Sequence, residues 1–560
     1  MAVATGFRCQ NTAPMTEHPP TPNPRRHRAA WLATVAFAAT LFTLVALGHD
    51  GRRVLQMVVL AAPVLLWMAW PVRRRWLRRL RLVVVWCWAM AFAVDGVLRA
   101  YLMEAYQAAP DSSLVLGAAA NTNGRESAEY LSMHWRTLLV WSGALVAAGF
   151  VFRRCLRRAG ADRIGRPWPR SVVLLLAVLV VVTSAANLSK PWRRLHPALF
   201  WTQWSRSVDT LRDGWADQQQ ERSALLARAR ASAPTVALAG PSTLVLVITD
   251  SINRDNMGLY GYGRATTPRL LALKHQLQDR MLVMRNAWSA DASTLPSLHN
   301  IMKFGQPDAP DTQHVLALAR AAGYKVWWMS NHDDIAIEQE HARMADVVEM
   351  VNRVPGRAGA SLDGELLDCL REALEDPTER KLIVVHLMGA HPHYGLRFPA
   401  GENPFDDQDD AVEDGMEDSG RSGWVRKSRQ EYDSAILYSD FVVAETLQLT
   451  RSAGRQGGHR AWMFLSDHGQ EVGHGGNHAG HSPQTASGYR IPAVVWRDGP
   501  ADPDSAAIQS RPFRADWGGW TIADLLHLRW RGSETDRDAL RGNYRWVAPA
   551  LPVVVRSFEE

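Results

Sequence analysis

Five long apolar segments lie in the first 190 residues, and they constrain the fold more than any other feature. They run over about 30–48, 54–71, 82–98, 137–152 and 171–187. Each is close to the ~20 residues that a helix needs to cross ~30 Å of hydrocarbon. Four further segments follow the first without a clear small-residue cleavage site, so the first is not a removable signal peptide. The sequence therefore predicts a five-helix transmembrane domain over 30–187.

Arginine clusters between these segments predict the orientation of the chain. The tail over 1–29 carries Arg25, Arg26 and Arg28, the loop "VRRRWLRRLR" holds six arginines, and the loop 153–170 holds seven. Because short cytoplasmic loops are rich in Arg and Lys, we expect a cytoplasmic N-terminus and everything after about 190 outside. The net charge of +7 then reflects membrane topology, and we expect no nucleic-acid partner.

Residues 188–240 mix Trp, Arg and polar residues at helical spacing, which predicts linker helices along the membrane surface. The soluble domain predicted over 241–560 contains one cysteine, Cys369. The chain has no CxxC pattern, which excludes a cysteine-type zinc site.

Four short apolar runs in the soluble domain resemble buried parallel strands: "STLVLVITD", "YKVWWMSN", "KLIVVHLMGAH" and "AWMFLSDHG". In open α/β sheets, ligands bind at the carboxyl ends of the strands. Any one polar residue there is more simply a helix cap or a turn residue, but four strands that end in this way favour one shared site. These ends carry Asp250, Asn331, His386 with His391, and Asp467 with His468.

The residue types at these ends fit zinc, because aspartate and histidine supply oxygen and nitrogen ligands and no thiolate is available. The segment "SADASTLPSLHNIMKFG" supplies a candidate nucleophile, Thr294, at the predicted start of a helix. A helix N-terminus favours phosphate oxygens, and zinc would lower the pKa of a hydroxyl group there. The alternative is that Ser293 or Thr294 is only a capping residue.

Several of these motifs resemble those of the membrane-bound phosphoethanolamine transferases, within the alkaline phosphatase/sulfatase superfamily. "VITDSINRDNMGLYGYGRATTPRL" is similar to their opening motif and "TLPSLHNIM" to their nucleophile segment. "IVVHLMGAHPHYGLRFP", "YDSAILYSDFVV" and "FLSDHGQEVG" resemble later blocks in the family order, and "NTNGRESAEYL" resembles the short periplasmic motif. The details are similar to the branch that acts on lipopolysaccharide core sugars. The resemblance implies a five-helix transmembrane bundle followed by a sulfatase-like α/β domain with a mostly parallel central sheet.

The resemblance also implies a role for each matching residue. The implied zinc ligands, for one ion or two, are Asp250, Thr294, Asp467 and His468. Thr294 is in addition the implied nucleophile, and His391 and His481 would assist proton transfer. The predicted substrate-binding residues are Thr122, Glu126, Asn331, His391, His478 and His481. Among these, His478 is the alternative to His481 for contact with the transferred group, and Thr122 and Glu126 match positions linked to lipid substrate.

The sequence departs from the family pattern at three places. Asp250 stands where the family has glutamate, which is one methylene longer, so zinc must lie closer to the strand end or bind through water. The disulfides of the lipid A branch are absent. Residues 406–418, "DDQDDAVEDGMED", carry eight acidic side chains, which predicts a solvated, mobile insertion loop or alternatively a divalent-ion site. His474, within the histidine-rich stretch, has no predicted role and is expected at the surface.

The function implied is transfer of phosphoethanolamine from phosphatidylethanolamine to a lipid-anchored glycan, either lipopolysaccharide core or lipid A. The expected location is the bacterial inner membrane, with a periplasmic catalytic domain. The alternatives are a phosphoglycerol transferase, a sulfatase-like hydrolase or phosphodiesterase, and a membrane protein with a decayed site. A sulfatase requires Cys or Ser in a Cys/Ser-x-Pro-x-Arg pattern. In this chain the first and last positions of that pattern are Thr294 and Leu298.

Overall fold

The computed structural model describes residues 24–559 except 70–71, 73, 123, 160–168, 217, 354–360 and 454–457. Most of the predicted cytoplasmic tail and part of the loop 153–170 therefore lie outside the described residues. The chain divides into two compact units, one of Met1–Ala100 with Leu139–Phe200 and one of Tyr101–Leu138 with Trp201–Glu560. The segment 101–138, which carries the motif "NTNGRESAEYL", thus belongs to the same unit as the soluble domain.

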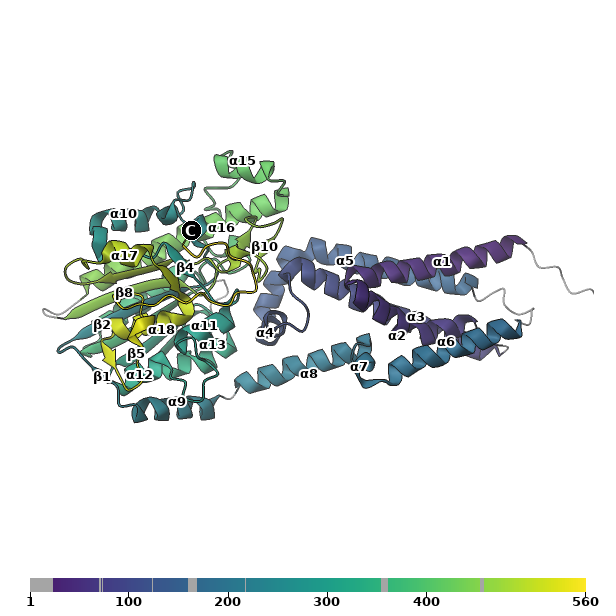
Figure 1. Ribbon diagram of the computed structural model, residues 1–560. Helices are drawn as coiled ribbons and strands as arrows, with labels where there is room; N and C mark the ends of the chain where they lie inside the picture. The colour runs from purple at the N-terminus through teal and green to yellow at the C-terminus, as the bar shows by residue number, and fades with distance from the viewer. Residues whose placement is uncertain are drawn as a thin grey trace, which may run out of the picture. The chain divides into compact units, whose positions relative to one another are not determined.

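The first unit is helical (Figure 1). It contains α1 (Pro24–Leu47), α2 (Gly51–Leu66) and α6 (Arg170–Leu188), with most of α3 (Arg75–Tyr106) and α5 (Gly124–Ala159). Among the described residues, four helices are long and apolar enough to cross a membrane, and they lie in α1, α3, α5 and α6. The segment predicted as a second span over 54–71 forms the 16-residue α2, which contains Pro63 and is followed by a 3-10 turn. This segment is too short to count among the four.

Helices α1 and α3 approach each other closely at one point. A Cβ atom at Gly96 would lie 2.1 Å from the carbonyl oxygen of Leu44, so only glycine fits there. Beside it, Asp95 is buried and accepts a hydrogen bond at 3.0 Å from Arg99, which lies four residues further along the same helix. His49 lies 2.8 Å from the second carboxylate oxygen of Asp95, a contact that spacing along one helix does not predict.

A sheet forms the centre of the second unit (Figure 1). It has seven strands in the order β3-β11-β8-β2-β7-β5-β6. The four apolar runs form β2 (Ser242–Thr249), β5 (Lys325–Ser330), β7 (Arg380–Leu387) and β8 (His459–Ser466), and adjacent strands among them are parallel. β6 (Val347–Met350) extends this parallel part, whereas β11 (Ala493–Arg497) and β3 (Met281–Val283) pair antiparallel at the other edge.

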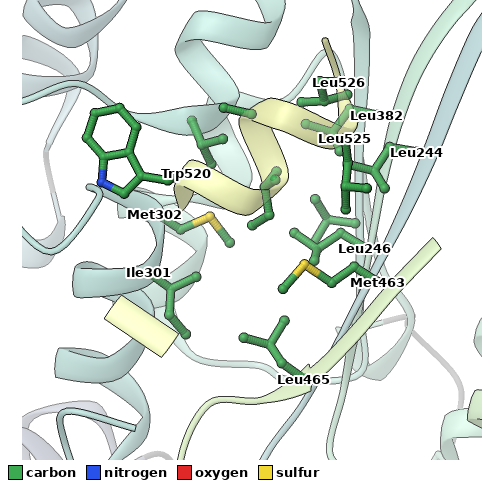
Figure 2. Packing of buried hydrophobic residues seen from close by; sticks show 14 of the residues in the cluster. Leu244, Leu246, Ile301, Met302, Leu382, Met463, Leu465, Trp520, Leu525 and Leu526 are labelled. Atoms are coloured by element: carbon green, nitrogen blue, oxygen red, sulfur yellow. The ribbon is translucent and has the colours of Figure 1, made fainter. Parts of the chain in front are cut away.

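The two faces of this sheet bury alternate residues of each strand, because successive strand side chains point to opposite faces. Leu244 and Leu246 of β2 pack with α11 (Thr294–Met302) and α18 (Gly518–Leu525), as Figure 2 shows. Val245 and Val247 pack in a second cluster that includes α10 (Pro268–Leu277), α14 (Leu366–Glu375) and α16 (Gly423–Ser452). Helix α11, which begins at the predicted nucleophile, is therefore anchored in the core through Ile301 and Met302.

The predicted linker over 188–240 contains α7 (Lys190–Arg193), α8 (Pro197–Ala216) and α9 (Gln219–Ala231), and the short strand β1 (Thr235–Val236) follows them. Trp204 of α8 donates to the Pro110 carbonyl at 2.7 Å, just before α4 (Ser113–Asn121), and α9 packs into the sheet core through Leu225 and Ala229. The acidic stretch 406–418 differs from its prediction as a loop. It contains the helix α15 (Ala411–Asp418), and the side chain of Asp410 caps this helix. The same carboxylate accepts a hydrogen bond from Arg264 at 2.7 Å.

Candidate active site

Two neighbouring strand ends bring the central acidic residues together. β2 and β8 are parallel with Thr249 opposite Ser466, so the residues that follow, Asp250 and Asp467, lie side by side. His468 completes a group in which one ligand atom from each residue lies within 4.8 Å of the other two. All three side chains are fully buried.

The hydrogen bonds leave one oxygen of Asp467 without a partner among the described residues. Asp467 Oδ1 accepts the backbone N–H groups of His468 at 2.6 Å and Ser251 at 3.1 Å. Asp467 Oδ2 is buried, has no hydrogen-bond partner among the described residues, and lies 3.6 Å from His468 Nε2. A buried oxygen left without a partner is costly unless a cation satisfies it.

The imidazole of His468 is oriented toward the same oxygen of Asp467. Its Nδ1 donates to the Gly469 carbonyl at 2.7 Å, which leaves Nε2 as the lone-pair nitrogen facing Asp467 and, at 3.8 Å, Asp250. A histidine that binds a metal through one ring nitrogen usually donates a hydrogen bond from the other to a carbonyl group or a carboxylate. Two carboxylates and one imidazole of this kind fit zinc, with a position left open for a reacting group.

The hydroxyl group of Thr294 reaches this group of ligands. Its Oγ1 donates to Asp250 Oδ2 at 2.8 Å and lies 3.4 Å from His468 Nε2. Thr294 is the first residue of α11, where helix N–H groups favour anions. Ser293 occupies the N-cap position without a side-chain capping bond in the part of the chain that is described. Among the residues described, Ser293 therefore makes no capping bond, and the Thr294 hydroxyl bonds to Asp250 instead of capping the helix.

The two carboxyl groups differ in charge because they share one buried site. Burial and the nearby Asp250 raise the pKa of Asp467 to about 7. Burial opposes ionisation of Asp250 as well, but attraction to neighbouring histidines in their protonated form, His391 first, outweighs it and lowers the pKa of Asp250. One anion and one group that is protonated near neutrality are the expected state of such a pair before a cation displaces the proton.

The other predicted histidines lie around this centre. The His481 ring is 4.8 Å from that of His468 and 6.3 Å from that of His391. Burial lowers the pKa of His481 to about 3 and that of His391 well below its usual value, so both imidazoles are neutral. His478 Nε2 lies 3.2 Å from the carbonyl of His481, and His478 and His481 both line the same cavity.

Two residues lie differently from their predictions. Asn331 donates to Asp363 at 2.9 Å and to the Ser361 carbonyl at 3.2 Å, and it is not among the described residues that line the cavity. Its side chain supports the loop after β5, so we do not retain it as a substrate ligand. His474 is half-buried rather than superficial, and its Nε2 lies 2.7 Å from Asn256 Oδ1.

A cavity of about 1420 Å³ opens beside Thr294, and all its lining residues belong to the second unit. Thr122 and Glu126 line it from the segment 101–138, and His391 lines it from the loop after β7. Apolar residues form part of its lining, among them Leu114, Leu116, Leu211, Trp215 and Leu295. Elsewhere Glu126 meets Asp333 and Asp334, with one carboxylate oxygen of each within 4.8 Å of the others. Asp333 and Asp334 are not among the site residues predicted from the sequence, although they follow the end of β5 as the predicted residues follow other strand ends.

Comparison with known proteins agrees with this arrangement. The sulfatase family model matches residues 242–517. Phosphoethanolamine transferase EptC of Escherichia coli K12 is 28% identical over 485 residues, which are 80% of this chain and 78% of EptC.

Two solved structures are similar. The C-terminal periplasmic domain of EptC from Escherichia coli, in complex with Zn, is 27% identical with a TM-score of 0.50, over 56% of this chain and 90% of that domain. The integral membrane protein lipooligosaccharide phosphoethanolamine transferase A (EptA) from Neisseria meningitidis has a TM-score of 0.55 over 92% of this chain and 98% of that one. At 18% identity, the second likeness concerns the fold alone. The chain is therefore similar to membrane-bound phosphoethanolamine transferases, and its residues 242–517 match the sulfatase family model.

Proposed function

We propose that this protein transfers phosphoethanolamine from phosphatidylethanolamine to a lipid-anchored glycan, lipopolysaccharide core or lipid A, through a phospho-threonine intermediate at Thr294. The observation that carries the proposal is the Thr294 hydroxyl, which donates to Asp250 at 2.8 Å within a buried ligand set for zinc. The similarity to phosphoethanolamine transferases supports the transferred group, and the zinc complex of the EptC domain supports the metal.

In the first displacement, Thr294 Oγ1 forms a bond to phosphorus while the bond from phosphorus to the diacylglycerol oxygen breaks. Asp250 Oδ2 already accepts the hydrogen bond of this hydroxyl and is placed to take its proton. Zinc, held by Asp250, Asp467 and His468, would lower the pKa of the hydroxyl and stabilise charge on the phosphoryl oxygens. The N-terminus of α11 supports the same charge.

In the second displacement, an acceptor oxygen attacks phosphorus and the bond to Thr294 breaks. The neutral imidazoles of His391 and His481 are proton acceptors, which suits removal of a proton from an acceptor hydroxyl group. Thr294 regains its proton and the site is ready for another donor. His478 remains the alternative to His481 for contact with the transferred group.

The cavity supports the choice of donor. The apolar part of its lining, which includes Leu114, Leu211 and Leu295, suits the acyl part of a lipid. The carboxylates of Glu126, Asp333 and Asp334 suit the ammonium group of ethanolamine, whereas glycerol carries no charge for them to neutralise. This favours phosphoethanolamine over phosphoglycerol, the second candidate. Such substrates require the catalytic unit to lie at the outer leaflet of the inner membrane, with the N-terminus in the cytoplasm.

Mass spectrometry of the full-length enzyme tests the function. After incubation with phosphatidylethanolamine and phosphatidylglycerol together, the peptide over 289–303 should carry phosphoethanolamine on Thr294. Phosphoglycerol on that peptide would establish the second candidate, and an unmodified peptide in an active enzyme would refute the phospho-threonine intermediate. Lipid profiling of cells with and without the protein identifies the acceptor.

A further inference from the structure

Ser251, the residue after Asp250, has a backbone conformation that serine rarely adopts. Its φ angle is +62°, in the left-handed region, and the residue is fully buried. Neighbouring groups hold it there. Tyr432 donates from its hydroxyl to the Ser251 carbonyl at 2.6 Å, and the next residue, Ile252, donates its N–H to Ser466 Oγ at 2.9 Å. A strained residue that several contacts fix in place points to a functional constraint.

This conformation lets one residue donate to both carboxylates of the centre. The Ser251 backbone N–H donates to Asp467 Oδ1 at 3.1 Å, and its hydroxyl donates to Asp250 Oδ1 at 2.5 Å. An extended backbone at Ser251 would direct the N–H and the hydroxyl differently. The left-handed turn is therefore what allows the two hydrogen bonds to form together.

Ser251 bonds to one oxygen of each carboxylate, and the Asp250 oxygen that it contacts, Oδ1, lies 3.8 Å from His468 Nε2. The other oxygen of Asp250, Oδ2, accepts from Thr294 at 2.8 Å, and the other oxygen of Asp467 is the one without a hydrogen-bond partner among the described residues. Rotation of either carboxylate would break a bond to Ser251. The carboxylates are thus held with one oxygen each toward His468 and Thr294.

We propose that Ser251 is a positioning residue that fixes Asp250 and Asp467 as ligands for a divalent metal and, through Asp250, aims the hydroxyl of Thr294. This inference rests on the zinc site of the proposed function. Groups that orient a metal ligand by hydrogen bonding typically contribute ~10–100-fold to metal affinity, and this is the loss expected when the Ser251 hydroxyl is removed.

The test measures the zinc affinity of the full-length, metal-stripped protein in detergent, by competition with a chromophoric chelator. Ser251→Ala and Ser251→Gly both remove the hydroxyl, but glycine accepts the left-handed backbone without strain. Ser251→Thr keeps the hydroxyl, but a β-branched residue is disfavoured at this φ. We expect the Ala and Gly variants to lose affinity alike, by ~10–100-fold. The Thr variant should retain most of the affinity.

Thermal unfolding of the metal-free variants separates positioning from stability. We expect the Ser251→Gly variant to be more stable than Ser251→Ala, and Ser251→Thr to be less stable than the wild type. Zinc affinity would then depend on the hydroxyl group, whereas stability would depend on the backbone conformation. If Ser251→Gly regains the affinity that Ser251→Ala loses, strain and not the hydroxyl controls the site, and the inference is wrong. If the Thr variant does not fold, the comparison of the Ala and Gly variants still shows whether the hydroxyl group or the backbone strain controls zinc affinity.

The failure of this inference differs from the failure of the proposed function. If the wild-type protein binds zinc and Ser251→Ala binds it equally well, only the role of Ser251 is refuted. If the wild-type protein itself does not bind zinc, both the zinc site and the role of Ser251 are refuted. The absorption bands of bound Co²⁺ give a further readout, since a displaced carboxylate should change them in Ser251→Ala and leave them unchanged in Ser251→Thr.

Discussion

Arg397 donates from Nη2 to Glu129 Oε2 at 3.1 Å, and this ion pair joins the segment 101–138 to the loop that carries His391. Arg397 also donates to the carbonyl groups of His391 at 3.3 Å and Pro392 at 3.2 Å. Only 5% of Arg397 is exposed. The same guanidinium thus holds the loop of a predicted substrate-binding histidine and a glutamate that lies 268 positions away in sequence.

Loss of this ion pair should weaken both stability and transfer. Glu129→Gln leaves a buried guanidinium without its anion, and breaking such a pair typically costs ~3–5 kcal/mol. We expect a lower midpoint of thermal unfolding and a slower transfer rate, because the His391 loop loses its attachment. Asp368→Asn is the matched control, since its partner Arg371 forms an exposed pair, and exposed pairs contribute ~0–1 kcal/mol. Equal effects of the two substitutions would contradict this role.

Removal of the nucleophile should separate metal binding from transfer. Thr294→Ala removes the attacking oxygen but leaves Asp250, Asp467 and His468, so we expect zinc to bind while transfer to a fluorescent lipid acceptor is lost. Ser293→Ala should transfer at close to the wild-type rate, because the Ser293 side chain makes no capping bond within the described structure. Chelation with EDTA should abolish transfer in the wild type, and zinc should restore it. Full activity of Thr294→Ala would transfer the role of nucleophile to another residue.

The centre itself could be predicted because it depends on local patterns that recur. An apolar run followed by a polar residue marks a strand end, and parallel neighbours place such ends together. Asp250 and Asp467 follow paired residues of β2 and β8 and therefore meet. The family resemblance then assigned these residues their roles.

The remaining features depend on contacts that no local pattern encodes. The pairing of Glu129 with Arg397, and of Asn121 with Asp334, requires two segments more than 200 positions apart to pack together. The left-handed backbone of Ser251 arises from contacts with Tyr432 and Ser466, distant in sequence, whereas serine alone favours no such conformation. The span predicted over 54–71 is not among the four helices of the described chain that are long and apolar enough, because α2 is apolar yet only 16 residues long.

A single methyl group at Gly389 should displace a zinc ligand. Gly389 has a φ of +54°, and a Cβ atom there would lie 2.7 Å from the backbone oxygen of Asp250. We therefore expect Gly389→Ala to weaken zinc binding strongly. Gly401→Ala provides the control, since Gly401 also has a positive φ, of +84°, but a Cβ atom there would meet no described atom within 4 Å. If both variants bind zinc as the wild type does, the close approach at Gly389 does not constrain Asp250.

The stability of the metal-free protein should fall between pH 6.5 and 9 because of His332. Burial opposes its charged form, but Asp334, at 3.6 Å, and Asp250 outweigh it and raise the pKa of His332 to about 9. In the unfolded chain the pKa is ~6.5, so the stabilisation is fully present below that pH and is lost as pH rises through 9. The shift corresponds to roughly 3 kcal/mol, measurable by denaturant unfolding at pH 6 and pH 9.5. His332→Gln should flatten this dependence, whereas the exposed His459→Gln should not, and an unchanged slope in His332→Gln would show that another group titrates.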